Sequence, residues 1–380
     1  MPARSPLTRL LSLRLRAGPG RLWLRWVAPA LLLVASSAGV DSGERAPLPP
    51  RGYTLRDLGT LGGEQSGATA LNNHGEVVGW AETGGAVRDG VREFHAVRWA
   101  ADGIQDLGTL GEYHSAAFGI NNRGEVVGGV LSGFDPEPFV WSTATGMHRL
   151  PLKDNFAGVG LSINDHGTIA GYFETTGYDK AGMWTDRLRW LSHPWDGRAL
   201  DVNNRGEVVG WGETLYDGLP KAFRWRGRRG RRLEPPPYRE TDPWSKAHAI
   251  NDRGTIVGEL EGRAFIWAEG RLRRLPAGAG YQKALAADLN RREQVVGTLF
   301  NHRNFFGPSE FPASPTGTAA LWERGRLTDL SDVVRLTSGW HLETAAAIND
   351  RGQIVGIGRP EGEGRGPRRA YLLTPVERER

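Results

Sequence analysis

Two aspartates stand at matching places in a repeated segment, and paired carboxylates could act as acid and base on a sugar chain. Asp201 and Asp288 each lie two residues before a repeated asparagine. A glycosidase or lyase needs such a pair, or a carboxylate and a second base, across one cleft. If residues alternate along the strand, both aspartates face the same crowded side as the small residues two positions earlier. Polar lining of a central channel is the simpler interpretation, and catalysis on a polysaccharide is the alternative.

Other reactive chemistries lack their residues in this sequence. The chain has no cysteine, which excludes disulfides, thiol catalysis and thiolate metal sites. Its nine histidines are dispersed without ligand spacing, and its Asn-Asp-x-Gly turns lack the spaced acids of a calcium loop. No nucleophile elbow or phosphate-binding loop occurs. We therefore assign no catalytic residue, no metal ligand and no cofactor from the sequence.

Aromatic and histidine side chains in segments of variable length are the best candidates for binding. Such side chains stack on sugar rings or anchor a protein partner. Packing of the loop against the core is the competing interpretation for each of them. The candidate binding residues are Tyr113, His114, Trp195, Tyr216, Trp244, Phe305, Phe306, Phe311, Trp340 and His341.

The segments that must position these residues belong to one unit that recurs seven times. The unit reads apolar, Asn, Asn or Asp, any residue, Gly, any residue, two apolar residues and Gly. The first copy is Leu71–Gly79, and the last is Ile348–Gly356. A spacing of about 40–50 residues is typical of a four-stranded propeller blade. The first asparagine of the unit stands at positions 72, 121, 164, 203, 251, 290 and 349.

Each copy can be divided into four strands. Ala or Gly four residues before the asparagine, and Leu, Ile or Val one before it, predict an innermost strand with a crowded face. The asparagine then opens a tight turn in which Gly takes a left-handed conformation. A third strand ends in Trp in six copies, and a Gly-bearing turn leads to the fourth. The sixth copy has Glu293 in place of the turn glycine, so we expect that turn to be remodelled.

The two ends of the repeat region complement each other. The seventh copy stops after its third strand near Thr374, and an extra strand, Tyr53–Leu61, precedes the first copy. Pairing this strand with the last blade would close the ring and remove two exposed edges. The sequence thus predicts an all-β fold, a seven-bladed β-propeller of four-stranded blades closed by its N-terminal strand. Length variation falls in the second-to-third and blade-to-blade connections, which antiparallel alternation places at one end.

These repeats resemble the extracellular HAF-repeat family of bacterial proteins. The family name echoes a His-Ala-Phe element, which here takes the forms His95-Ala96-Val97, Lys221-Ala222-Phe223 and Arg263-Ala264-Phe265. The resemblance covers about residues 53–375 and implies export and a repeat architecture. It carries no catalytic residues that could be transferred to this chain.

The N-terminal region has the pattern of an export signal. Six arginines and no acid occupy residues 1–25, and an apolar run from Trp26 to Ala35 precedes small residues. We divide the chain into a signal peptide (1–38), a linker (39–52), the propeller (53–375) and a tail (376–380). Cleavage near Ala38 is expected, with a retained anchor as the alternative. Without residues 1–38 the net charge falls from +5 to −1, which gives no basis for nucleic-acid binding.

The leading function from sequence is an exported, non-enzymatic binding module that uses the loops at one end of the ring. Its partner would be a protein or an extracellular polysaccharide, and the protein is expected to act as a monomer. It would be secreted, periplasmic or held at the cell surface, without stable membrane insertion after cleavage. The alternatives are a polysaccharide hydrolase or lyase at the propeller axis and a structural cell-surface protein without a discrete ligand. Clustered carboxylates at a channel mouth would favour an enzyme, and an aromatic patch would favour binding.

Overall fold

The computed structural model describes most of residues 52–376. The gaps are residues 89–90, 133–134, 153–155, 176–177, 193–195, 214–217, 234–242, 302–316 and 361–365. The predictions for the signal peptide, for nearly all of the linker and for residues 377–380 of the tail lie outside the described residues. Across the described part of the chain, no helix is long and apolar enough to span a membrane.

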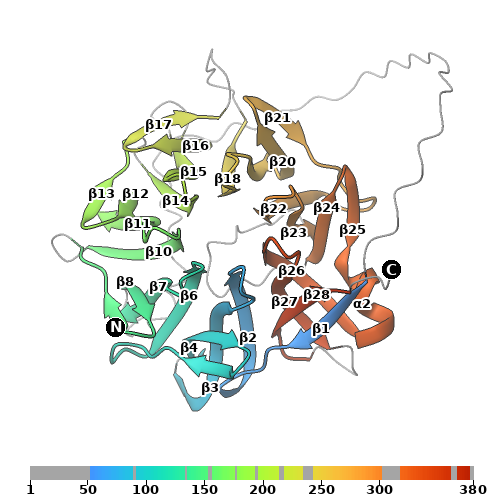
Figure 1. Ribbon diagram of the computed structural model, residues 1–380, viewed down its shortest axis with the longest axis horizontal. Helices are drawn as coiled ribbons and strands as arrows, with labels where there is room; N and C mark the ends of the chain where they lie inside the picture. Colours follow the sequence, from blue (N-terminus) through green and yellow to red (C-terminus); the bar gives the residue numbers. More distant parts are fainter. Residues whose placement is uncertain are drawn as a thin grey trace, which may run out of the picture. The chain divides into compact units, whose positions relative to one another are not determined.

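Seven antiparallel four-stranded sheets form a ring, as Figure 1 shows, and this confirms the seven-bladed propeller. Blade 1 consists of β2 (Gly62–Leu71), β3 (Val77–Arg88), β4 (Val91–Ala100) and β5 (Gly103–Asp106). Blade 2 consists of β6 (His114–Ile120), β7 (Val126–Ser132), β8 (Asp135–Ser142) and β9 (Gly146–Arg149). Blade 3 consists of β10 (Ala157–Ile163), β11 (Ile169–Thr175), β12 (Tyr178–Trp184) and β13 (Leu188–Trp190). Blade 4 consists of β14 (Gly197–Val202), β15 (Glu207–Glu213), β16 (Pro220–Arg226) and β17 (Arg229–Arg232). Blade 5 consists of β18 (Ser245–Ile250), β19 (Ile256–Leu260), β20 (Arg263–Ala268) and β21 (Arg271–Arg274). Blade 6 consists of β22 (Lys283–Leu289), β23 (Val295–Phe300), β24 (Thr318–Glu323) and β25 (Arg326–Asp329).

Blade 7 is assembled from both ends of the described chain. It contains β26 (Trp340–Ile348), β27 (Ile354–Pro360) and β28 (Arg369–Pro375), and β1 (Tyr53–Asp57) supplies its outer strand. The pairing of β1 with β28 is antiparallel, with Tyr53 opposite Pro375 and Asp57 opposite Tyr371. The predicted closure by the N-terminal strand is confirmed, with a shorter strand than Tyr53–Leu61.

The repeated asparagine joins each blade to the next. Its Oδ1 accepts the backbone N–H groups two and four residues later, as in Asn72 with His74 and Glu76, both at 3.0 Å. Its Nδ2 donates to the backbone carbonyl of the equivalent asparagine in the following blade, at 2.9–3.2 Å. The last of these bonds runs from Asn349 to Asn72 and closes the circle. Seven side chains therefore fix their own turns and hold the ring together.

The next residue of each turn forms a second circle. In most blades its backbone N–H donates to the Asn or Asp side chain at the same place in the following blade, as from Asn122 to Asp165 at 2.8 Å. Blade 6 has Arg291 there, which has no acceptor atom, so the circle is interrupted between blades 5 and 6. Instead, the Arg291 guanidinium lies 3.6 Å from Asp252 and 3.3 Å from Asp350. An ion-pair bridge thus stands where one hydrogen bond is lost.

All seven innermost strands contain a β-bulge, which the repeat pattern did not predict. In blade 4, Ala199 pairs with Gly210 and Asp201 pairs with Val209, so Leu200 is the extra residue. Consecutive residues of the partner strand face opposite sides, hence Ala199 and Asp201 face opposite sides as well. Blade 6 has the same shift between Ala286 and Asp288. The expectation that the aspartates share a face with the small residues is therefore wrong, because one inserted residue reverses the alternation.

The repeated Trp of the third strand is a packing residue of the blade interfaces, as predicted. Trp99, Trp184, Trp225 and Trp322 are almost fully buried. In blade 4, the Trp225 Nε1 donates to the Ser192 carbonyl, in the connection from the preceding blade, at 3.0 Å. Leu373, which replaces Trp in the seventh copy, is buried in the core that forms around the closing strand.

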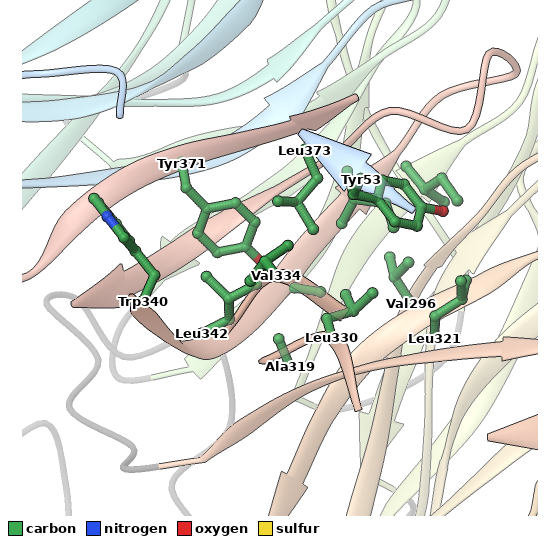
Figure 2. Close-up of a cluster of buried hydrophobic side chains, with 13 residues drawn as sticks. Tyr53, Val296, Ala319, Leu321, Leu330, Val334, Trp340, Leu342, Tyr371 and Leu373 are labelled. Atoms are coloured by element: carbon green, nitrogen blue, oxygen red, sulfur yellow. The ribbon is translucent and has the colours of Figure 1, made fainter. Parts of the chain in front are cut away.

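A helix follows blade 6 in a segment that the sequence suggested only as a connection of variable length. The helix α2 (Leu330–Ser338) begins after Asp329, whose carboxylate accepts the Ser331 N–H at 2.8 Å as a helix cap. Its Leu330 and Val334 are fully buried. Figure 2 shows them packed with Tyr53 of the closing strand and with Leu342. The helix therefore covers the core where the ring closes.

Glu293 keeps the turn geometry of the glycine it replaces, so the expected remodelling is wrong. Its φ angle is 59°, in the left-handed region, and its N–H donates to the Asn290 carbonyl at 3.1 Å. The Asn290 side chain makes the same contacts as in the other copies. A left-handed non-glycine residue costs about 1–2 kcal/mol. The hydrogen bonds of the ring outweigh that cost and impose the common turn.

We expect Glu293→Gly to raise the free energy of unfolding by about 1 kcal/mol, because it relieves the left-handed strain at this turn. Urea unfolding of the two proteins measures the difference. The matched control is Gly254→Ala in blade 5, where φ is 85°. That substitution should destabilise by a similar amount. A Glu293→Gly protein less stable than the parent would show that the Glu293 side chain outweighs its backbone strain.

Deleting residues 39–61 removes β1 and should cause a large loss of stability or aggregation, because the edge of β28 becomes exposed. Deleting residues 39–50 should change the melting temperature little, since β1 remains. Thermal melts of both truncated proteins make the comparison. Equal melting temperatures would contradict the role of β1 in closure.

Candidate functional site

The two ends of the propeller differ in construction. One end, here called the Asn-turn end, has the seven turns that begin at residues 72, 121, 164, 203, 251, 290 and 349. Each turn has one length and one hydrogen-bond pattern. The opposite end, here called the variable end, has the second-to-third connections and the blade-to-blade connections, whose lengths differ widely. This confirms the predicted separation of uniform turns from variable connections.

A well opens on the propeller axis at the Asn-turn end. Its volume is about 190 Å³, and three consecutive residues of every blade line it, from the apolar residue before the asparagine to the one after it. The rim includes Asp165, Asp252 and Asp350. Asn122 and Asn204 occupy the same place in other blades and accept the same type of backbone hydrogen bond. Because Asn and Asp are interchangeable there, these carboxylates serve as hydrogen-bond acceptors of the turns.

Both axial aspartates make hydrogen bonds that link blades. Asp201 accepts from the Ser162 hydroxyl at 2.6 Å and from the N–H groups of Val202 and Ile250, both at 2.8 Å. Asp288 accepts from the N–H groups of Leu289 at 2.7 Å and Ile348 at 2.8 Å. Each carboxylate therefore binds the inner strand of its own blade and of the next. All four oxygen atoms have a donor within the protein, an arrangement that suits structural links.

The same aspartates resist ionisation. Burial raises the pKa of Asp288 to about 7, and the charges of Asp201 and Asp350 add to the effect, while the two N–H donors only partly offset it. Burial likewise raises the pKa of Asp201. At the rim, burial opposes ionisation of Asp165, but hydrogen bonds from Asn122 and Asn204 outweigh it and hold its pKa below the usual value.

The described loop candidates all lie near the variable end but do not come together. Tyr113 and His114 are in blade 2, Trp244 precedes the inner strand of blade 5, and Trp340 and His341 begin that of blade 7. His114 stacks on Phe94 at 4.2 Å and accepts the Phe94 N–H at 3.3 Å. Trp340 is buried in the core shown in Figure 2, so it is a packing residue, whereas His341 is exposed. The other five candidates, Trp195, Tyr216, Phe305, Phe306 and Phe311, lie outside the described residues.

Sequence reasoning missed an aromatic cluster on blade 3, here called the blade 3 aromatic cluster (Phe156, Phe173 and Trp190). Phe173 is stacked at 6.0 Å from Phe156 and lies 5.2 Å from Trp190 between ring centroids. Strand pairing puts Phe173, Tyr178 and Trp190 on one face of the sheet. Gly182 opposite Trp190 has no side chain, which leaves room for the two rings to meet. Only the pairing register reveals this.

Trp190 of this cluster and Tyr178, which lies on the same face of the sheet, are open to solvent. Tyr178 is 49% exposed and Trp190 is 45% exposed. Both stand at the variable end, Tyr178 at the start of β12 and Trp190 at the end of β13. Large apolar side chains exposed in the described residues are Val87, Tyr178, Trp190, Leu219 and Val376, and all but Val376 belong to the variable end.

Two basic side chains contact aromatic rings between the blades from blade 3 to blade 5. Arg198 binds Asp179 at 2.7 Å, and its guanidinium lies 4.1 Å from the centre of the Tyr172 ring. In the next interface the Lys246 ammonium lies 5.2 Å from the centre of the Trp211 ring. Such contacts stabilise the interfaces between blades. The variable end of blades 3 to 5 therefore combines exposed rings with hydrogen-bonding groups.

The His-Ala-Phe element is part of the core and contributes little to any surface site. Its central alanine is buried in each form, as Ala96, Ala222 and Ala264. The following Phe223 and Phe265 are buried as well. The element is the start of the third strand and packs the blade from within.

Comparison with solved structures agrees on the fold. A catalytically inactive virginiamycin B lyase from Staphylococcus aureus, solved with quinupristin, superposes with a TM-score of 0.51 at 14% identity, over 85% of this chain and 100% of that one. An acylaminoacyl peptidase from Pyrococcus horikoshii gives a TM-score of 0.50 at 10% identity, over 81% of this chain and 51% of that one. No family model and no curated protein sequence matches. Similarity at this level establishes a shared propeller architecture and leaves the function open.

We expect stability to fall as pH rises from about 5 to 8, because Asp288 must ionise in a poorly solvated place. Its folded pKa of about 7 lies above the usual 3.8. The stabilisation of the fold by protonated Asp288 is therefore complete below about pH 4 and is lost as pH rises through 7. Asp288→Asn should have a lower overall stability but a flatter dependence on pH. Melting temperatures across this range measure both effects.

The matched control for that experiment is Asp165→Asn. The pKa of Asp165 is lowered, so this carboxylate is ionised throughout the range tested. Its replacement should leave the dependence on pH between 5 and 8 as in the parent protein. Identical pH profiles for the parent and Asp288→Asn would show that Asp288 is ionised in this range.

Proposed function

We propose that this protein is an exported, non-enzymatic binding module that engages an extracellular glycan or a protein through its variable end. The observation that carries the proposal is the distribution of exposed apolar side chains. Four of the five such side chains in the described residues belong to the variable end, and two of them, Tyr178 and Trp190, lie on one face of the blade 3 sheet. Exposed aromatic rings beside polar groups suit stacking on a sugar or anchoring of a partner.

The construction of the Asn-turn end supports the same choice. The first side chain of every turn and the second of most turns accept or donate hydrogen bonds between blades, so a change at either would disturb the neighbouring blade. Connections at the variable end differ in length from blade to blade without such a constraint. Variation concentrated on one face of a repeat array commonly marks the binding face.

An enzyme acting at the axis is the weaker alternative. Its best candidates, Asp201 and Asp288, have both oxygens engaged by donors that fix the blades. Neither aspartate lines the axial well. The three rim carboxylates do cluster at a channel mouth, but asparagine performs their role in other blades. A general acid or base must reach a substrate proton, and these groups bind the backbone instead.

The test begins with glycan-array and pull-down screens of the exported protein, followed by affinity measurements on Tyr178→Ser/Trp190→Ser. We expect this double variant to lose at least about tenfold in affinity, because buried aromatic anchors contribute about 2 kcal/mol or more to an interface. Trp190 also contacts Phe173, so a small loss of melting temperature is expected. The affinity and the melting temperature together distinguish a loss of binding from a loss of folding.

The control is His166→Ser, an exposed residue in the Asn turn of the same blade. Its affinity for the ligand should equal that of the parent protein. If the double variant binds normally while His166→Ser fails, the working surface would have to be the Asn-turn end. Turnover of a polysaccharide substrate by the parent protein would contradict the non-enzymatic assignment.

Export and membership of the HAF-repeat family belong to the same proposal. The basic, then apolar, N-terminal pattern supports export, with cleavage near Ala38 and a monomeric product in the periplasm, the medium or at the cell surface. The seven-fold repeat supports the family. Neither carries information about which glycan or protein is bound.

A further inference from the structure

The outermost strands of blades 4 and 5 carry an excess of positive charge. β17 and β21 each have arginine at three of their four positions and no acid. Both are edge strands, and Figure 1 shows them at the outer rim of the ring. The edge strands of blades 1, 6 and 7 end in Asp106, Asp329 and Asp57. In blade 2 the Arg149 guanidinium lies 3.6 Å from Glu112. The excess therefore distinguishes two neighbouring blades.

Four arginines share one face of the blade 4 sheet, here called the blade 4 arginine face (Arg224, Arg226, Arg229 and Arg231). Strand pairing puts Arg224 directly opposite Arg231 and Arg226 directly opposite Arg229. Opposite side chains lie on one face, with Cβ atoms about 4.5–5.5 Å apart, and alternate residues of a strand share that face. The face is directed toward blade 5, because the Arg224 guanidinium lies 5.5 Å from the centre of the Trp267 ring.

Only part of this charge is neutralised within the described part of the chain. The Glu207 Oε1 accepts the Arg224 Nη2 at 2.6 Å and the Arg226 Nε at 2.7 Å. The exposed guanidinium groups of Arg229 and Arg231 have no hydrogen bond or ion pair with another described residue. Four arginines and one bound glutamate leave three positive charges. Like charges directly opposite one another destabilise a sheet, so the free protein retains a repulsion that a bound anion would remove.

The edge of blade 5 extends the positive surface. Leu233, which directly follows β17, packs in one hydrophobic cluster with Phe265 and Leu272 of blade 5, so the two edges are neighbours. Arg274 lies opposite Phe265 and therefore on the face of blade 5 that is directed toward blade 4. Its side chain is exposed. An anion bound at the blade 4 arginine face can thus continue along the next blade.

Protection of the sheet edge does not account for this arrangement. Charged residues on an edge strand prevent pairing with another chain, but edges of mixed charge serve that purpose on other blades. At the place of the Arg226 and Arg229 pair, blade 6 has Glu323 opposite Arg326. At the place of the other pair, blade 1 has an arginine opposite Gln105. Blade 4 alone among these three puts arginine opposite arginine, which suits a surface for an anionic ligand.

We propose that the outer edge of blades 4 and 5 binds an acidic polysaccharide, whose carboxylate or sulfate groups contact the blade 4 arginine face. Guanidinium groups bind such oxyanions through pairs of parallel hydrogen bonds. The two opposite pairs stand two residues apart along the strands, about 6.8 Å, and a polymer with one charge on each sugar unit or on every second unit has comparable spacing. Duplex DNA has one charge per about 1.7 Å, a much denser array than three net charges match.

The surface lies on the rim of the ring and not at the variable end, so its test is independent of the proposed function. The probes are a short oligogalacturonate and a short sulfated oligosaccharide. Each is titrated into the isotope-labelled full chain while the arginine Nε–Hε resonances are followed. We expect saturable shifts at Arg226, Arg229 and Arg231, with none at Arg56 and Arg149 on the edges of blades 7 and 2. A neutral malto-oligosaccharide should cause no shifts.

The variant Arg229→Gln/Arg231→Gln measures the contribution of the two unpaired arginines. Its affinity for the acidic probe should fall at least about tenfold at about 50 mM salt, and the decrease of affinity with salt should become less steep. Without ligand it should melt at or above the parent temperature, because both opposite arginine pairs are removed. If it does not fold, the shift pattern of the parent protein decides.

Two controls locate the binding. Arg56→Gln/Arg149→Gln removes the same number of charges from other edge strands, and its affinity should stay within about twofold of the parent, since exposed charges contribute little at a distance. Tyr178→Ser/Trp190→Ser changes the variable end and should bind the acidic probe as the parent does. The arginines of residues 1–25 are the same in all these proteins, so differences between them report on the folded ring.

Four results would overturn the proposal. One is the absence of saturable shifts at the blade 4 arginine face with both acidic probes. Another is an equal loss of affinity in Arg56→Gln/Arg149→Gln, which would assign the binding to net charge. The third is a loss in Tyr178→Ser/Trp190→Ser, which would assign it to the variable end. The last is tighter binding of a single-stranded oligonucleotide of equal charge, which would make the surface a nucleic-acid site.

Discussion

The hydrogen bond from each repeated asparagine to the next blade is the interaction on which the rest of the structure depends. One side chain satisfies two N–H groups of its own turn and one carbonyl of its neighbour. A net contribution of about 0.5–1.5 kcal/mol per bond is modest, but the bonds form a closed circle that no blade can leave without breaking two of them. The chain has no cysteine, so this circle and the β1 pairing perform the closure that disulfides provide in other folds.

The architecture could be predicted because each of its rules is local. Asn72 and its equivalents mark turns, small residues mark crowded strands and Trp marks the interfaces, and each motif repeats often enough to average out exceptions. The bulge before each turn could not be predicted, because it concerns which residue of β15 lies opposite Asp201, and strand register is a relation between two segments. The error about the face of Asp201 and Asp288 followed directly from that missing relation.

The same reason explains what was missed at the candidate sites. Trp190 gave no signal in the sequence, since its exposure depends on Gly182 across the sheet and on its place at the edge of blade 3. Trp340, by contrast, stands in a segment whose pattern indicates a loop, but it is buried because α2 folds against the core beside it. Glu293 shows the opposite case. The preference of a non-glycine residue for negative φ yields to the hydrogen bonds of the Asn290 turn, which match those of the other six turns.

The directions of β1 and β28 show where the described chain enters and leaves the ring. β28 runs toward the Asn-turn end and β1 runs away from it, so Tyr53 and Pro375 lie opposite one another at that end. A segment attached before Tyr53 therefore starts from the end that the hydrogen-bonded circles already occupy. The second-to-third connections of blades 3 and 4 lie at the other end of the ring. The same closure that stabilises the propeller thus puts the start of β1 at the end opposite to Tyr178 and Trp190.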